Sequence, residues 1–171
     1  MPFTPFHFGP GLLLKGVMPN QFSLSTFALA NVAMDIEPLY RMLAGDAVLH
    51  GATHSLLGAA GIAAATAMWG RRGIHMAWRV YERLGGSALA SAPISALQAW
   101  LSALLGTFSH VLMDALMHAD MRPFLPLTDA NPWLHVSWTE DVYLGCVLAG
   151  MVGMLLILIR AAFQPEHSPN R

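Results

Sequence analysis

Three residues with metal-binding side chains recur at intervals of four in one apolar stretch. They are His110, Asp114 and His118. On a helix this spacing places all three on one face. A carboxylate buried among apolar side chains needs a compensating cation, and zinc favours imidazole and carboxylate ligands. The stretch therefore predicts a metal site, and the alternative is a metal-free His-Asp-His chain that relays protons. Asp120, just beyond it, is either a further ligand or a partner of Arg122.

A second histidine pair, His50 and His54, has the same spacing and precedes another apolar run. Thr53 and Ser55 are placed to orient an imidazole or to begin a helix. Solvated histidines at a helix start are the alternative. The recurrence of the pattern in a chain of 171 residues favours metal binding. Three other histidines, His75, His135 and His167, are expected outside the site.

Two further acids, Asp35 and Glu37, stand at the end of an apolar stretch. Acids within membrane segments are rare and usually functional or paired. Both are therefore candidates for catalytic residues, and Asp35 is also a candidate ligand. In the alternative, they lie at the water boundary, where Pro38 ends the helix and Arg41 neutralises one of them.

The composition is that of an integral membrane protein. The chain is 55% hydrophobic and 11% charged, with a mean hydropathy of +0.49, whereas soluble domains are roughly 25% charged. Its length predicts a single membrane-embedded domain over residues 1–171. A net charge of −1 offers no surface for nucleic acid. The single cysteine, Cys146, excludes a cysteine cluster, so a metal must be held by nitrogen and oxygen ligands.

Three segments are expected to cross the membrane. Residues 142–159 carry no charge and approach the roughly 20 residues that a span requires. Residues 54–69 and 95–117 are the other two. The arginine-rich connection over residues 71–83 is expected in the cytoplasm by the positive-inside rule. Both histidine groups then lie at the opposite, extracytoplasmic end.

The amino-terminal part allows two topologies. Glycines and prolines are expected to interrupt any helix before Asn20, and residues 22–41 either span the membrane or form a short buried helix. The predicted fold is therefore an all-α integral membrane bundle of three to four transmembrane helices, with an N-terminal re-entrant or interfacial segment. Gly145, Ala149 and Gly153 repeat every four residues, a face through which an oligomer or a larger membrane complex could form.

Several of these motifs together resemble a known family. They are an early His7, the Asp35-Ile36-Glu37 acids, the Thr53-His54-Ser55-Leu56-Leu57 run and the Ser109-His110-Val111-Leu112-Met113-Asp114 run. Over residues 1–125 the chain resembles the inner-membrane metal-dependent hydrolases associated with the LexA regulon. The family's usual His-Arg-Gly-x-Thr-His-Ser motif is one residue shorter here and lacks the arginine.

That family is distantly similar to zinc-dependent phospholipase C. The resemblance implies a zinc-type site with five ligands: His7, Asp35, His54, His110 and Asp114. With the residues singled out by spacing, the full predicted ligand set is His7, Asp35, His50, His54, His110, Asp114 and His118.

The leading functional prediction is a membrane-embedded hydrolase that binds one to three divalent ions, with zinc as the expected metal. Such ions lower the pKa of water from about 15.7 towards about 7, and Asp35 or Glu37 would accept the proton. The expected substrate is a phosphoester of a lipid or lipid-linked molecule at the extracytoplasmic interface of the inner membrane. The alternative is a non-catalytic membrane subunit with a structural metal or a proton relay in a larger complex. A divalent-metal transporter ranks last, because its ligands should lie near mid-membrane.

Overall fold

The computed structural model describes residues 5–85 and 93–163, and its regular elements in these ranges are all helical, as predicted. The helices are α1 (Phe8–Val17), α2 (Leu24–Ala44), α3 (Leu56–Ala65), α4 (Arg71–Arg83), α5 (Ala96–Met117) and α6 (Thr139–Ala162). Short 3-10 turns are η1 (Pro5–His7), η2 (Ala52–His54) and η4 (Val136–Trp138). A π-helical turn, η3 (Thr66–Gly70), joins α3 to α4 without a break.

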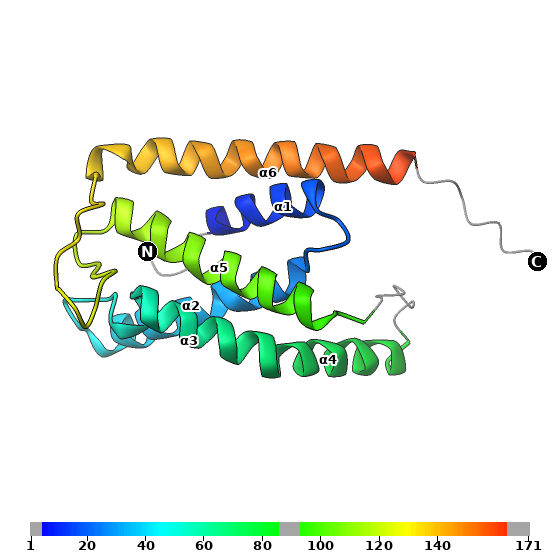
Figure 1. Ribbon diagram of the computed structural model, residues 1–171, viewed down its shortest axis with the longest axis horizontal. Coiled ribbons are helices and arrows are strands. Elements are labelled where there is room, and N and C mark those ends of the chain that lie inside the picture. Colours follow the sequence, from blue (N-terminus) through cyan, green and yellow to red (C-terminus); the bar gives the residue numbers. More distant parts are fainter. Residues whose placement is uncertain (1–4, 86–92, 164–171) are drawn as a thin grey trace, which may run out of the picture.

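The helices form two groups, which Figure 1 shows one above the other. In one group α1 packs along α6, and in the other α5 packs against both α2 and α3. The two groups meet mainly through α1, which also contacts α2, whereas α5 and α6 touch only slightly. The short first helix therefore connects the long last helix to the rest of the bundle.

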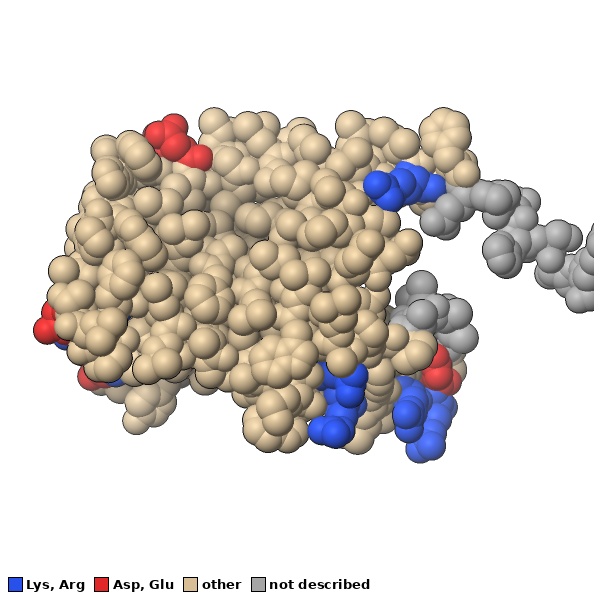
Figure 2. Space-filling view, viewed as in Figure 1, with Lys and Arg blue, Asp and Glu red and all other residues tan. Residues whose placement is uncertain are grey.

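Two helices are long and apolar enough to cross a membrane: α5, and α6 together with the preceding turn from Val136. The outer face of α6 exposes large apolar side chains such as Leu148, Met151 and Leu155. On the face shown in Figure 2, charged side chains lie near the two ends and an uncharged band separates them. Both features fit a chain surrounded by lipid. The expected span at residues 54–69 is divided between α3 and η3, so three or four spans stay a prediction.

The expectation that glycines and prolines interrupt the chain before Asn20 is wrong for residues 8–17, which form α1. Glycines on both helices bring α1 and α6 into close contact. A Cβ atom on Gly153 would overlap the backbone of Leu12 and Leu13, and one on Gly16 would lie 2.9 Å from the Gly153 carbonyl oxygen. Packing against α6 thus outweighs the low helix propensity of glycine.

Pro38 does not end α2, contrary to the interpretation given above. The helix continues to Ala44 and stops at Gly45, whose φ of 79° lies in the left-handed region that suits glycine. Pro38 is buried inside the bundle. Membrane helices tolerate such a proline because neighbouring helices compensate for the lost backbone hydrogen bond.

Small side chains let α2, α3 and α5 approach one another closely. One buried cluster consists of five alanines from these helices and η3: Ala30, Ala63, Ala67, Ala99 and Ala103. A second cluster, nearer the histidines, consists of Met34, Ala59, Val111, Ala115 and Met121. Van der Waals contact between small residues is the usual basis of helix association in lipid. This packing fixes α2, α3 and α5 relative to one another.

Replacing Gly153 by leucine should destabilise the protein by separating α1 from α6. Overpacking of this kind costs about 1–3 kcal/mol, which corresponds to a melting temperature lowered by roughly 2–12 °C in detergent. Gly145→Leu is the matched control, because no atom lies within 4 Å of a Cβ placed there. Equal melting temperatures for the two variants would show that the α1–α6 contact does not stabilise the fold.

Candidate metal centre

The seven predicted ligands come from five parts of the chain. Helix α5 carries His110 and Asp114 one turn apart, and His118 caps its carboxyl end. Helix α2 contributes Asp35, the turns η1 and η2 contribute His7 and His54, and His50 lies in the extended segment before η2. The side chains of His54 and His110 are fully buried. The set therefore forms one cluster inside the bundle.

Asp114 lies at the centre of this cluster. Its Oδ2 atom is 3.1 Å from the Nε2 of His110, 3.6 Å from that of His54 and 3.8 Å from that of His50. Its Oδ1 atom is 3.3 Å from the Nε2 of His7 and 3.8 Å from that of His118. One buried carboxylate thus faces five imidazoles, divided between its two oxygen atoms.

Asp35 adds a second carboxylate, with its Oδ1 atom 3.3 Å from the Nε2 of His110. Three overlapping groups each have ligand atoms close enough to hold one ion: His7, His110 and Asp114; Asp35, His54 and His110; His50, His54 and Asp114. The groups share members, so the cluster could hold closely spaced ions or one ion with a choice of ligands.

A chain of hydrogen bonds orients the imidazole of His54. Glu37 accepts hydrogen bonds from the backbone N–H of Thr53 at 2.9 Å and from its hydroxyl group. Since that hydroxyl donates to Glu37, its oxygen accepts from the Nδ1–H of His54 at 3.1 Å. The Nε2 atom of His54 therefore carries the lone pair and faces Asp114.

Arg41 in turn fixes Glu37, with its Nε 3.0 Å and its Nη2 2.9 Å from Oε1. Both carboxylate oxygens of Glu37 are thus engaged outside the cluster. Its predicted role as a general base stays a prediction, and its contacts favour a role in positioning His54.

Asn31 orients His110 through a hydrogen bond at Nδ1, as Thr53 does for His54. The Asn31 amide nitrogen donates to the Phe27 carbonyl oxygen at 2.9 Å, so its Oδ1 atom accepts from the Nδ1–H of His110 at 3.1 Å. This leaves the Nε2 lone pair of His110 directed at Asp35 and Asp114. The sequence analysis missed Asn31, because a single asparagine in an apolar helix carries no motif.

Asp120 orients His50 rather than binding Arg122. It accepts from the His50 Nδ1 at 2.9 Å and from the backbone N–H groups of Leu49 and His50 at 2.9 and 3.1 Å. Burial would raise the pKa of the Asp120 carboxyl, but these hydrogen bonds outweigh it and lower the pKa to about 2. Arg122 instead pairs with Asp129 at 3.4 Å.

The buried ring nitrogens that face the carboxylates have no hydrogen-bond partner. These atoms are the Nε2 of His54 and of His110, and both nitrogens of His7. Two of these imidazoles, those of His54 and His110, are held at Nδ1 by Thr53 and Asn31, whereas His7 has no such partner. Imidazole nitrogens without a hydrogen-bond partner beside buried carboxylates could hold a divalent cation of the zinc type, and the metal-free relay stays the alternative.

The other histidines lie outside the cluster. His135 is exposed and stacks on Trp138, with ring centroids 4.4 Å apart. His75, on α4, accepts a hydrogen bond from the Ile94 backbone, so it is not simply solvated. His167 lies outside the described residues. His50 and His54 belong to the cluster, but neither stands on an α-helix, because α3 begins after Ser55, whose hydroxyl caps it.

Comparison with known proteins gives one family. The family model described as "YdjM inner membrane protein" matches residues 13–167. This range includes every predicted ligand except His7, and it covers α2 to α6. No curated protein and no solved structure matches the chain.

Removing a central ligand should reduce metal binding sharply. We expect His54→Ala and Asp114→Ala to retain less zinc than the wild-type protein after purification in detergent, because each residue belongs to two of the three overlapping groups. Elemental analysis by mass spectrometry measures the ratio of metal to protein. His135→Ala is the control and should keep the wild-type ratio. The assignment would be contradicted if folded wild-type protein bound neither zinc nor any other divalent ion.

Removing the acceptor behind His50 should weaken metal binding without abolishing it. Outer partners of this kind contribute about 10–100-fold in metal affinity, so Asp120→Ala should lower zinc affinity by that factor and Asp120→Asn by less. Competition with a zinc-binding dye measures the change. Asp129→Ala removes an exposed carboxylate at the same end of the molecule. If that variant were equally affected, the loss would reflect surface charge and not the orientation of His50.

Proposed function

Because this chain belongs to the YdjM inner membrane protein family, we propose that it is a membrane-embedded, metal-dependent hydrolase. The observation that carries the proposal is the set of buried imidazoles whose free Nε2 lone pairs converge on Asp114. Seven candidate ligands exceed the four that a closed structural zinc site uses. The surplus favours a site in which donors remain for more than one ion or for substrate.

The ligands of such a centre would be the imidazoles of the cluster with Asp35 and Asp114. A bound ion of the zinc type supplies Lewis acidity and lowers the pKa of water to about 7. Asp114 is suited to be shared between two ions, since its oxygens face different imidazoles. We assign proton acceptance to Asp35, which faces His110 within the cluster, and the positioning of His54 to Glu37.

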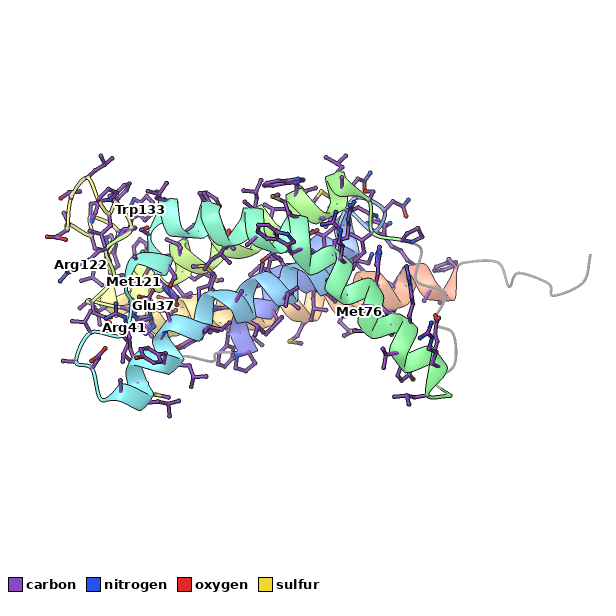
Figure 3. The ribbon with its side chains drawn as sticks, turned by 90° about the horizontal axis from the view of Figure 1, so that it is seen from below. Glu37, Arg41, Met76, Met121, Arg122 and Trp133 are labelled. Atoms are coloured by element: carbon purple, nitrogen blue, oxygen red, sulfur yellow. The ribbon has the colours of Figure 1, made fainter. Side chains whose placement is uncertain are left out.

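A cavity beside the cluster supports a phosphoester as substrate. Its volume is about 330 Å³, and His50 is the predicted ligand that lines it. Arg41 and Arg122 line it as well, and Figure 3 shows both at the same end of the molecule as Glu37. Two guanidinium groups next to a metal centre suit a phosphate group. The resemblance to zinc-dependent phospholipase C agrees with this substrate class. We also propose that the chain is one of the hydrolases associated with the LexA regulon.

The orientation in the inner membrane follows from charge. The end of the bundle away from the cluster carries Lys15, Arg160 and the four arginines of α4. We place this end in the cytoplasm by the positive-inside rule, which makes the protein multi-pass with its site on the extracytoplasmic side. A centre at that interface suits the headgroup of a lipid or a lipid-linked molecule.

The alternative, a structural subunit of a larger complex, is favoured by one observation. Gly145 is exposed and has no neighbour that a Cβ atom would meet, whereas Gly153 is already used by α1. Helix α6 therefore keeps part of its small-residue face free for a second membrane helix.

Turnover of a phosphoester tests the proposal. Purified, zinc-loaded protein should hydrolyse bis-p-nitrophenyl phosphate or a phospholipid in mixed micelles, and His54→Ala and Asp114→Ala should reduce kcat/KM by at least about 100-fold. Arg122→Gln should mainly raise KM, because Arg122 lines the cavity without reaching the metal ligands. His135→Ala should behave as wild type.

The same assay separates the two functions and tests the orientation. Stoichiometric zinc without turnover of any phosphoester would support the structural subunit instead. Intact spheroplasts should hydrolyse a membrane-impermeant substrate at the rate of permeabilised cells. Activity seen only after permeabilisation would place the site on the cytoplasmic side.

A further inference from the structure

A second cavity lies at the opposite end of the bundle from the metal centre. Its volume is about 620 Å³, and it is lined by α1, the α1–α2 connection, α4 and the start of α5. Figure 3 places Met76 of α4 at this end, far from Glu37 and Arg41. The cavity shares no residue with the one beside the cluster. It therefore has no part in the proposed hydrolysis.

The charged lining of this cavity is mainly cationic. Lys15 and Arg79 contribute positive charges and Glu82 a negative one. His75 also lines it, and its Nε2 atom accepts the Ile94 N–H at 3.0 Å. Among the described residues, neither Lys15 nor Arg79 forms an ion pair. An anion is the ligand that these side chains fit.

Lys15 is held in place by the backbone. Its ammonium group donates to the carbonyl oxygens of Pro19 at 2.7 Å and of Phe22 at 3.1 Å. An ammonium group has three N–H donors, so one remains for a ligand. Because the group is already fixed, little side-chain entropy is lost when an anion binds.

A third cavity, of about 560 Å³, adjoins Lys15 on its other side and shares Lys15, Pro19 and Asn20 with the second. Its remaining lining comes from the carboxyl end of α6, where Ile157 and Phe163 are apolar and Arg160 is cationic. Lys15 thus lines both a cavity with several charged and polar side chains and a cavity in which Arg160 is the other charged residue and apolar side chains predominate. This pairing matches the two parts of a phospholipid.

Helix α4 places these cavities at a membrane surface. It carries four arginines, buries none of its residues and exposes Met76, Val80 and Tyr81. Exposed apolar and cationic side chains together are typical of a helix in the lipid headgroup region. In Figure 2 the blue side chains gather at this end of the molecule.

We propose that the two cavities around Lys15 form one binding site for an anionic phospholipid of the adjacent leaflet. The phosphate group lies between Lys15 and Arg79, and the acyl region follows Ile157 and Phe163. The site is independent of the metal centre and of its chemistry. It would hold a lipid at the contact between α1 and α6.

Lipid titration of the detergent-purified protein tests this site. Native mass spectrometry should show phosphatidylglycerol binding at least about fivefold more tightly than phosphatidylcholine with the same acyl chains, since one cationic contact is worth roughly this factor. Arg79→Gln should remove most of the preference. Lys15→Gln should do the same, but that variant also loses the contacts to Pro19 and Phe22, so Arg79→Gln is decisive.

Arg72→Gln is the matched control, because Arg72 stands on the same helix but does not line either cavity. It should keep the wild-type preference. If Arg72→Gln and Arg79→Gln lose equal affinity, the preference comes from general surface charge and the site is overturned. If inorganic phosphate at millimolar concentration displaces the lipid and binds by itself, the cavity takes a free anion and the lipid assignment fails.

Discussion

The buried carboxylate of Asp114 is the constraint on which the arrangement of this bundle depends. A negative charge in the apolar interior of a membrane protein is very unfavourable without compensation. Five imidazoles face it, three of them held from behind by Thr53, Asn31 and Asp120. These outer contacts turn the Nε2 atoms of His50, His54 and His110 towards the carboxylate. The charge of Asp114 can be compensated there by a bound cation, as the proposed function requires, or by protonated imidazoles.

Close helix packing makes this convergence possible. Ligands separated by more than a hundred residues, such as His7 and Asp114, can meet only if the backbones between them approach closely. Alanines between α2, α3 and α5, and glycines between α1 and α6, provide that approach. Much of the chain's glycine and alanine thus serves the site indirectly, through the spacing of the helices.

The sequence predicted the members of the site better than the elements that carry them. His110 and Asp114 could be predicted to share one face of a helix, because residues four apart lie on the same side of any α-helix. His50 and His54 were found by the same spacing, yet they lie before α3, where an extended segment and a turn bring them together. His7 came only from resemblance to a family. Asn31 gave no pattern, and Asp120 was considered as a ligand or a partner of Arg122 but not as the acceptor for His50, since both roles depend on contacts between distant segments.

The errors in the fold have a common cause. The expectations for the glycines of α1 and for Pro38 of α2 relied on intrinsic helix propensities, which describe an isolated helix in water. Inside this bundle, contacts with neighbouring helices decide the outcome. The sequence left the choice between three and four spans to residues 22–41, which form most of α2. It did not predict that the expected span at residues 54–69 continues through η3 into the amphipathic α4 without a turn.

The pairing of α1 with α6 has a consequence for biosynthesis. His7 is translated before every other ligand, but the helix that follows it takes its main support from α6, which is separated from it by four other helices in the chain. Helix α1 therefore lacks its main packing partner until the final hydrophobic segment has entered the bilayer. A truncated product without α6 would leave His7 poorly held, so the arrangement around Asp114 would be completed only after full insertion.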